Sequence, residues 1–289
     1  MSDNKKTIIA LGNFDGVHIG HSALLTAAVN TAKQTNAQPM VWTFERHKYS
    51  PSYITSKEDK IALFRKAGIE KVCFADFFEV RDYTPERFVD EILIGKHNCK
   101  GVVCGFNFHF GAAGRGDAST LRHLCRERNL ECTVCDAVKY NGSPVSSTRI
   151  REALTAGDLD KANAMLGRDW SVELPVLEGR KVGRGMGMPT INQHFPDGMV
   201  IPSHGVYAGY ARIDGRPQLC VTNIGVRPTF GTSDLVTCES HLLDYTGDLY
   251  GQTVRLTPKK YLRPEKKFGS PEDLVAQIRR DIEAARTIG

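Results

Sequence analysis

Hydrophobic positions in the first half of the chain fall into two alternating patterns. Short apolar runs predict β-strands at 7–12, 39–44, 71–75, 101–105 and 131–138. Between these runs, apolar residues recur at helical spacing and predict helices at about 20–35, 57–67, 85–95 and 117–128. Strands that alternate with helices are typical of a parallel sheet flanked by helices, so we expect an α/β domain here.

The pattern changes in the second half. Two short helices are expected within 147–167, and β-rich segments then follow at 170–178, 205–213, 218–224, 236–245 and 252–262. Ser270-Pro271-Glu272 predicts the start of a last helix over about 271–286. Several short strands with one helix favour a small antiparallel β-barrel. We therefore predict two domains, 1–168 and 169–289.

Composition is consistent with two globular domains. The chain has 289 residues, of which 41% are hydrophobic and 25% charged, enough for two separate cores. It has no apolar run of membrane-spanning length and no secretory signal at its start, so we expect a cytoplasmic protein without a membrane partner. The net charge of +5 is spread over both halves, which argues against a nucleic-acid partner.

The eight cysteines are expected to be reduced thiols, because disulfides are rare in the cytoplasm. Cys132 and Cys135 form the only close pair, and they lie in an extended run. Positions three apart on a strand point to opposite faces. The pair therefore indicates core packing rather than a metal or redox site.

The segment 12–21 carries the strongest chemical signal, with the sequence Gly-Asn-Phe-Asp-Gly-Val-His-Ile-Gly-His. It follows an apolar strand and enters a helix, so His18 and His21 share one face of the first turn. A helix start offers unpaired N–H groups and positive potential, which suit a phosphate. Glycines in this loop allow a nucleotide to approach the backbone closely. The alternative is a tight turn with two surface histidines.

This string resembles the nucleotide-binding motif of the nucleotidylyltransferase superfamily, in the form carried by bifunctional bacterial riboflavin kinase/FAD synthetases. The resemblance implies a Rossmann-like N-terminal domain that transfers an adenylyl group from ATP to FMN. It implies that His18 and His21 stabilise the α-phosphate of ATP. ATP-binding or phosphate-binding roles are implied for Gly12, Phe14, Asp15 and Gly20. Asp15 could order the loop or contact the ribose or a metal ion.

Two later segments of the first half resemble further motifs of the family. Residues 105–111 read Gly-Phe-Asn-Phe-His-Phe-Gly, which implies that Asn107 and Phe108 hold the flavin; His109 stands where arginine is common. Thr43-Phe44-Glu45-Arg46-His47 resembles Thr-Phe-x-Pro-His-Pro. Since Arg46 and Lys48 replace the prolines, only His47 is carried over.

The segment 145–151, Val-Ser-Ser-Thr-Arg-Ile-Arg, has the hydroxyl groups of a helix N-cap followed by two arginines. Arginine is unfavourable at a helix start by the helix dipole alone, which indicates a compensating anion. The segment resembles the family's Ser-Ser-Thr-x-Ile-Arg motif. That resemblance implies phosphate binding by Ser147, Thr148, Arg149 and Arg151, with the arginines near the departing pyrophosphate.

In the second half, residues 179–192 combine a glycine-rich stretch with Pro-Thr-Ile-Asn. Thr190 and Asn192 are two apart in extended chain and face the same way, so they can converge on one metal ion or phosphate. The stretch resembles the Gly-x-Pro-Thr-Ala-Asn signature of riboflavin kinases. It implies that Thr190 binds the Mg²⁺ of ATP. Phosphate binding is implied for Gly183, Gly185, Gly187 and Asn192.

Three other stretches resemble riboflavin kinases. One is 223–231, Asn-Ile-Gly-Val-Arg-Pro-Thr-Phe-Gly, and another is the strand that contains Glu239. Glu239 is the implied general base for the neutral 5′-hydroxyl of riboflavin, and His241 on the same face is interpreted as structural. The third is Arg263-Pro264-Glu265-Lys266-Lys267-Phe268, in which Arg263 is implied to lie by the flavin.

The leading hypothesis is a two-site enzyme that phosphorylates riboflavin to FMN and then adenylylates FMN to FAD. Mg²⁺ with ATP is the expected cofactor, FMN and FAD are intermediate and product, and a homo-oligomer is left open. One alternative is a single activity with a decayed second site, and another is a flavin sensor without turnover. A different nucleotidylyltransferase leaves the C-terminal motifs unexplained. A tRNA ligase is disfavoured because Lys-Met-Ser-Lys-Ser is absent.

Overall fold

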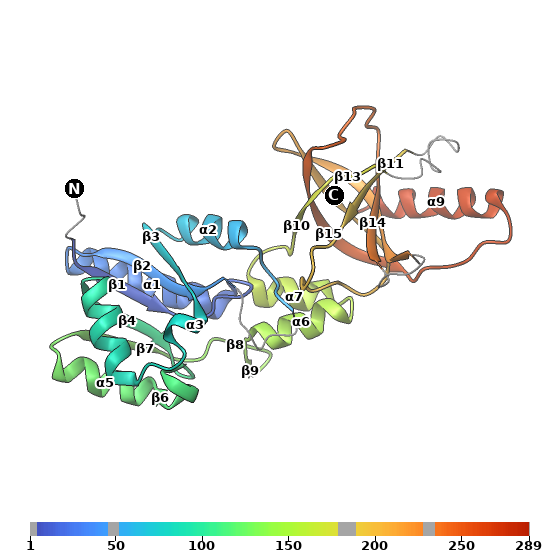
Figure 1. Ribbon diagram of the computed structural model, residues 1–289. Coiled ribbons are helices and arrows are strands. Elements are labelled where there is room, and N and C mark those ends of the chain that lie inside the picture. The colour runs from blue at the N-terminus through green and yellow to red at the C-terminus, as the bar shows by residue number, and fades with distance from the viewer. Residues whose placement is uncertain (1–4, 46–51, 179–188, 228–234, 289) are drawn as a thin grey trace. The chain divides into compact units, whose positions relative to one another are not determined.

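The computed structural model describes residues 5–45, 52–178, 189–227 and 235–288 (Figure 1). The chain divides into two units, Met1–Ser147 and Thr148–Gly289. We predict a domain boundary after residue 168, on the C-terminal side of two short helices, α6 (Ser147–Thr155) and α7 (Leu159–Leu166). That exact boundary stays a prediction.

The first unit contains a five-stranded parallel sheet in the order β3-β2-β1-β4-β7, as predicted for an α/β domain. Its strands are β1 (Thr7–Leu11), β2 (Gln38–Phe44), β3 (Lys71–Ala75), β4 (Cys99–Gly105) and β7 (Glu131–Cys135). Strands β2 and β3 lie on one side of β1. After β3 the chain returns and places β4 on the other side of β1. The carboxyl ends of β1 and β4 therefore flank the topological switch point, where open α/β sheets bind ligands.

Helices cover both faces of this sheet because its strands are apolar on both sides. On one face, Ile8 packs with residues of α1 (Ile19–Gln34) and α2 (Lys57–Lys66). On the other face, Ile9 packs with the π-helical segment Phe88–Lys96 and with α5 (Ala118–Glu127). Cys132 packs on the second face and Cys135 on the first, which confirms the packing role predicted for this pair.

Several local elements differ from the sequence-based expectation. The helix predicted at 85–95 is a single turn, α4 (Pro85–Arg87), that continues as the π-helical segment. A further turn, α3 (Phe77–Val80), was not predicted. Two short strand pairs are also additional: β5 (His109–Phe110) with β6 (Gly116–Asp117), and β8 (Lys139–Tyr140) with β9 (Ser143–Pro144). Strands of two residues are too short to leave a periodic pattern.

The second unit is a six-stranded antiparallel sheet in the order β10-β15-β12-β13-β14-β11. Its strands are β10 (Val172–Pro175), β11 (Thr190–His194), β12 (Gly205–Ile213), β13 (Arg216–Arg227), β14 (Leu235–Leu242) and β15 (Thr253–Arg263). A bridge between Leu177 and Asn192 links the two ends of this order and nearly closes a barrel. The predicted antiparallel barrel is confirmed. Strand β11 was not among the predicted strands, although Thr190 and Asn192 were expected in extended chain, because its polar residues follow a glycine-rich stretch.

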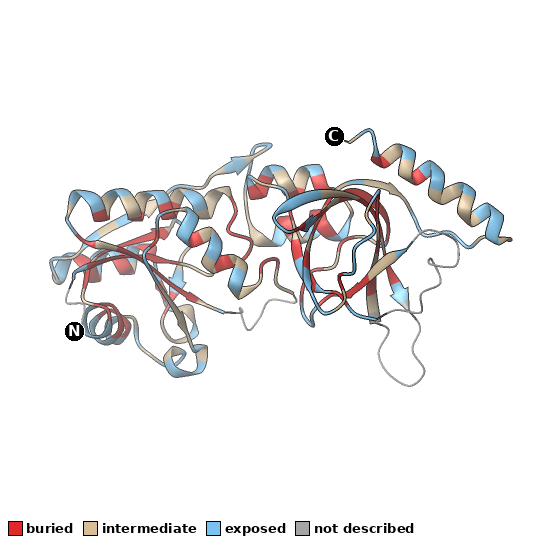
Figure 2. Cartoon of the chain, turned by 90° about the horizontal axis from the view of Figure 1, so that it is seen from above, coloured by how far each residue is buried: buried red, intermediate tan, exposed pale blue. Residues whose placement is uncertain are grey.

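The last helix, α9 (Pro271–Ala285), packs its apolar face on the barrel. Ser270 caps it by accepting a hydrogen bond from the Asp273 N–H, and Pro271 occupies the first turn, as predicted. Figure 2 shows buried residues along the barrel strands and near the C-terminal end of α9, whose other residues are half-buried or exposed. None of the helices in the described ranges has both the length and the apolar character needed to cross a bilayer.

Gly209 marks a close approach of two barrel strands. A Cβ atom there would lie 2.4 Å from the Thr257 carbonyl oxygen of β15, next to a register shift after Ala208. We predict that Gly209→Ala lowers the free energy of unfolding of the barrel by about 1–3 kcal/mol, because the backbone must move apart. Native-state hydrogen exchange of the barrel amides measures this change. Gly269→Ala, whose nearest contact would be at 3.8 Å, is the control and should cost less than about 0.5 kcal/mol.

Candidate active sites

The loop between β1 and α1 has an unusual backbone conformation. Phe14, Gly16 and Val17 have φ values of 50°, 82° and 40°, in the left-handed region. Non-glycine residues adopt this region only where surrounding contacts hold them. His18 then acts as the N-cap of α1, with an extended backbone.

His18 and His21 form a reciprocal cap at the start of α1. The His21 N–H donates to Nδ1 of His18 at 3.2 Å, and the His18 N–H donates to Nδ1 of His21 at 3.4 Å. This is the geometry of a capping box, with two imidazoles in place of the usual hydroxyl and carboxylate side chains. The rings stack with their centroids 3.6 Å apart and their planes 16° from parallel. The structure therefore brings the two predicted histidines together.

The cap also decides where each neutral ring carries its proton. A nitrogen that accepts a hydrogen bond carries no proton, so the proton of each neutral ring is on Nε2. His18 is buried and His21 is half-buried. The pair thus offers two ring N–H donors whose orientation is set by the main chain.

Gly12 and Gly20 are needed for packing around these rings. A Cβ at Gly12 would lie 3.1 Å from the Phe14 ring, and a Cβ at Gly20 would lie 3.1 Å from the His18 ring. The Phe14 and His21 rings are also in contact, with centroids 5.0 Å apart. Small residues at both positions leave room for the aromatic side chains themselves.

Asp15 joins the loop to two later segments of the first unit. Its Oδ1 accepts hydrogen bonds from the backbone N–H of Ile54 at 2.8 Å and of Thr55 at 3.4 Å. Its carbonyl oxygen accepts a hydrogen bond from Oγ of Ser147 at 2.8 Å. Among the roles left open by the sequence, these contacts support ordering of the loop.

The predicted flavin residues Asn107 and Phe108 follow β4, the strand beside β1 at the switch point. Asn107 is exposed, and its carbonyl oxygen accepts a hydrogen bond from Nδ1 of His109 at 3.0 Å. Phe108 is half-buried and stacks on Phe110, with centroids 5.6 Å apart. Both this segment and the histidine loop therefore lie at the carboxyl end of the parallel sheet.

The other residues of the first half that the family resemblance singled out are on α6 or outside the described residues. Arg149 and Arg151 are half-buried, and Nη2 of Arg151 donates to Oγ1 of Thr148 at 3.3 Å. These three residues belong to the second unit, so their position relative to the histidines stays a prediction. His47, with Arg46 and Lys48, lies outside the described residues.

The pairing of three neighbouring strands places the predicted kinase residues next to one another. On neighbouring strands β11, β14 and β13, Asn192 lies directly opposite Glu239, and Glu239 lies directly opposite Asn223. Thr190 is two residues before Asn192 and lies opposite His241. Directly opposed residues place their side chains on the same face of a sheet. The structure therefore groups a hydroxyl, two amides and a carboxylate on one face.

Two neighbouring side chains support this face. Nδ1 of His241 donates to the Pro189 carbonyl oxygen at 2.9 Å, just before Thr190, which agrees with a structural role. The Glu265 carboxylate accepts a hydrogen bond from Nδ2 of Asn223 at 3.0 Å. Three predicted phosphate-binding residues lie outside the described residues, namely Gly183, Gly185 and Gly187.

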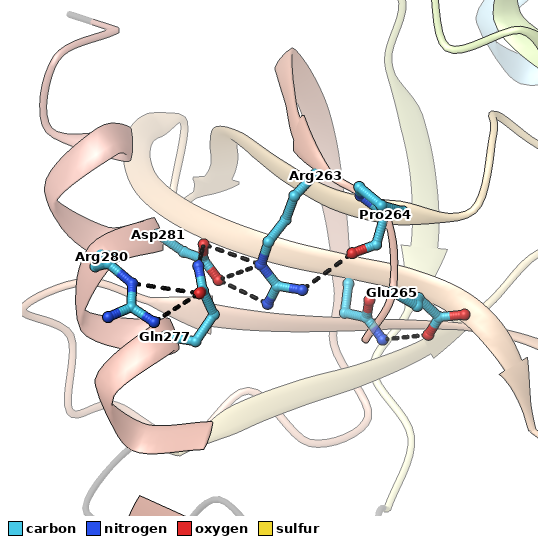
Figure 3. A network of polar contacts seen from close by, with 7 residues as sticks. Arg263, Pro264, Glu265, Gln277, Arg280 and Asp281 are labelled. Carbon is cyan, nitrogen blue, oxygen red and sulfur yellow. Dashed lines mark hydrogen bonds and ion pairs between the residues drawn. The ribbon is translucent and has the colours of Figure 1, made fainter. Parts of the chain in front are cut away.

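Arg263, predicted to lie by the flavin, is bound to α9. Its Nε and Nη2 donate to the Asp281 carboxylate at 3.1 and 2.8 Å, and its Nη1 donates to the Pro264 carbonyl oxygen (Figure 3). Gln277 donates to the same carboxylate at 2.9 Å. Since Asp281 is 4% exposed, this ion pair is a buried anchor between β15 and α9. Contact with a flavin stays a prediction.

Two buried charged residues, Asp281 and Lys60, were missed by the sequence reasoning. Both lie on amphipathic helices, α2 and α9, where the apolar pattern predicts only apolar residues on the buried side. Lys60 is four residues before the buried Phe64, so the two share one helix face. The four-residue spacing from Lys60 to Phe64 was the signal in the sequence that could have indicated a buried lysine.

Comparison with known proteins decides the family. A family model described as FAD synthetase matches residues 1–149, and one described as riboflavin kinase matches residues 166–289. The bifunctional riboflavin kinase/FMN adenylyltransferase of Listeria monocytogenes is 33% identical over 96% of this chain and 91% of its own length. The chain belongs to this bifunctional family.

Other relatives agree. The bifunctional riboflavin kinase/FMN adenylyltransferase of Pseudomonas fluorescens is 34% identical, over 99% of this chain and 94% of its own length. A crystal structure of a protein named macrolide-efflux protein, from Streptococcus pneumoniae, has a TM-score of 0.88 and 26% identity; the match covers 99% of this chain and 95% of that one. The chain is thus an enzyme of flavin cofactor synthesis, with the predicted order of domains.

The Arg263–Asp281 pair leads to a stability prediction for the kinase unit of this bifunctional enzyme. Asp281→Ala leaves the Arg263 guanidinium, with 19% of its side chain exposed, without its carboxylate. We expect a loss of about 2–3 kcal/mol in the opening free energy of α9, measured by hydrogen exchange. Asp244→Ala removes the exposed pair with Arg286 at the end of the same helix and should cost less than about 1 kcal/mol. Equal losses in the two variants would contradict the anchor role of Asp281.

Proposed function

We propose that His18 and His21 carry the adenylyl-transfer step by donating their Nε2 protons as hydrogen bonds to oxygens of the α-phosphate of ATP. The observation that supports this role is the reciprocal cap, in which both Nδ1 atoms accept main-chain N–H groups. Donors held in this way need no reorganisation as negative charge develops in the transition state.

The reaction needs no general base. A phosphate oxygen of FMN, already negatively charged, forms a bond to the α-phosphorus of ATP while the bond to the leaving pyrophosphate breaks. Catalysis then depends on positioning and charge stabilisation. Arg149 and Arg151 neutralise the departing pyrophosphate, assisted by the hydroxyls of Ser147 and Thr148. Asn107 and Phe108 hold the flavin of FMN.

For riboflavin phosphorylation, Glu239 is the general base. It accepts the proton of the 5′-hydroxyl as that oxygen bonds to the γ-phosphorus of ATP and ADP leaves. The register alignment of Glu239 with Asn192 and Asn223 supports this assignment. Arg263 lies by the flavin, and its ion pair with Asp281 holds its side chain in place on β15.

Thr190 and Asn192 suit a magnesium ion bound together with ATP. A hydroxyl and an amide oxygen are hard ligands, and magnesium sites of nucleotide enzymes use few protein ligands beside the phosphates. The ion would neutralise charge on the transferring phosphoryl group. Gly183, Gly185 and Gly187 would cover those phosphates.

The remaining expectations extend this proposal. Riboflavin, FMN and ATP are the small-molecule partners, and the protein works in the cytoplasm without a membrane or nucleic-acid partner. The domain boundary after residue 168 stays a prediction, and a homo-oligomer is left open.

We predict that His21→Ala and His18→Ala each lower the rate of FAD formation from FMN by about 10²–10³-fold, since each removes one aligned donor. Riboflavin phosphorylation, assayed separately, should not change. His123→Ala, a change of an exposed histidine in the same unit, is the control. A loss below tenfold would overturn the role of the histidine concerned.

For the kinase unit, Glu239→Gln should lower FMN formation from riboflavin by about 10²–10⁴-fold, because the amide cannot accept the hydroxyl proton. FAD formation from supplied FMN should be unchanged. Glu173→Gln, which changes a carboxylate paired with Arg255 elsewhere on the barrel, serves as the matched variant. Retention of most kinase turnover in Glu239→Gln would show that another group removes the proton.

A further inference from the structure

Lys60 is a buried lysine beneath the histidine loop. It lies on α2 and is 1% exposed. Lysine is almost never fully buried unless its charge is compensated. Burial lowers the pKa of Lys60, whereas the neighbouring carboxylates of Asp15 and Glu45 raise it. Such a residue is costly and calls for a specific role.

The Lys60 ammonium binds three main-chain carbonyl groups. Its Nζ donates to the carbonyl oxygens of Asn13 at 3.2 Å, Phe44 at 3.3 Å and Glu45 at 3.1 Å. An ammonium has three donors, so these contacts match its capacity. The carbonyls lie just beyond β1 and at the end of β2, where chains leave the sheet. One side chain therefore joins the ends of two neighbouring strands.

Other contacts between the loop and α2 surround this one. The Asp15 carboxylate accepts N–H bonds from Ile54 and Thr55, just before α2. The Phe14 ring packs edge-on against Phe64 of α2, with centroids 5.4 Å apart. The loop is therefore connected to α2, and to the residues just before it, by the Asp15 carboxylate, the Lys60 ammonium and the packed rings of Phe14 and Phe64. Together they oppose the cost of the left-handed backbone at Phe14, which is of the order of 1–3 kcal/mol for such residues.

We propose that Lys60 is a positioning residue for adenylyl transfer: by binding the Asn13 carbonyl it holds the loop so that His18 and His21 reach the α-phosphate of ATP. Lys60 itself touches neither substrate nor the reacting atoms. This inference rests on the proposed role of the two histidines.

The test compares Lys60→Met with Lys66→Met, which changes an exposed lysine on the same helix. Lys60→Met should lower kcat for FAD formation by about 10²-fold, because small displacements of catalytic groups cost that much. KM for FMN and ATP should change less than threefold, and the riboflavin kinase rate should be that of the parent enzyme. A kcat within threefold of the parent, or a loss that appears mainly in KM, would overturn the proposal.

A double-mutant cycle separates positioning from a general loss of structure. If Lys60 acts through the histidines, Lys60→Met should cost less than threefold when both His18 and His21 are already alanine. The same large loss in both backgrounds would overturn the proposal. If instead His21→Ala alone leaves FAD formation intact, the proposed histidine role fails, whatever Lys60 does.

Thr43 provides a milder variant should Lys60→Met unfold the first unit, as judged by circular dichroism. Oγ1 of Thr43 donates to the same Asn13 carbonyl oxygen at 3.0 Å. Thr43→Val keeps the shape and removes this hydroxyl donor, which also lies 3.3 Å from the Phe44 carbonyl oxygen. It should lower kcat for FAD formation about three- to tenfold at unchanged KM. An unchanged kcat in Thr43→Val would overturn the proposal.

Discussion

Main-chain polar groups at the carboxyl end of the parallel sheet are the constraint on which the first site depends. Where β1 and β2 end, their carbonyl groups leave the strand ladder and need other partners. Lys60 supplies three donors to these carbonyls, and Thr43 supplies a further one to Asn13. The His18 and His21 rings in turn accept main-chain N–H groups at the start of α1. The hydrogen bonds that fix this part of the fold therefore also set the orientation of the two histidines proposed to act on ATP.

This sharing explains why a strained loop stays in one conformation. The backbone at Phe14 and Val17 is unfavourable for residues with a Cβ, yet both side chains are buried and packed. Imidazole is well suited to the cap, because one nitrogen serves the main chain while the other remains a donor. A serine or glutamate in the same place would cap the helix without presenting a ring N–H.

The second site depends on strand register instead. Thr190 and Glu239 are far apart in sequence, and only the pairing of β11 with β14 brings their strands together. A shift of one residue in that pairing would place Glu239 on the opposite face from Asn192. Buried polar contacts inside the barrel help to hold the register. Gln193 donates to the Leu174 carbonyl oxygen at 2.6 Å, and Thr222 is hydrogen-bonded to Ser240 at 2.8 Å.

Periodicity in the sequence determined the fold class, the order of the two domains and the loop that carries His18 and His21, because these depend on local spacing. It did not separate the polar strand β11 from the glycine-rich stretch before it. It also did not reveal the buried charges of Lys60 and Asp281, since a charged residue on a helix is expected to be exposed. Which carbonyls Lys60 binds, how Arg263 is anchored and which residues face Glu239 were decided only by tertiary structure. Those partners lie far along the chain and meet only when strands pair and helices pack.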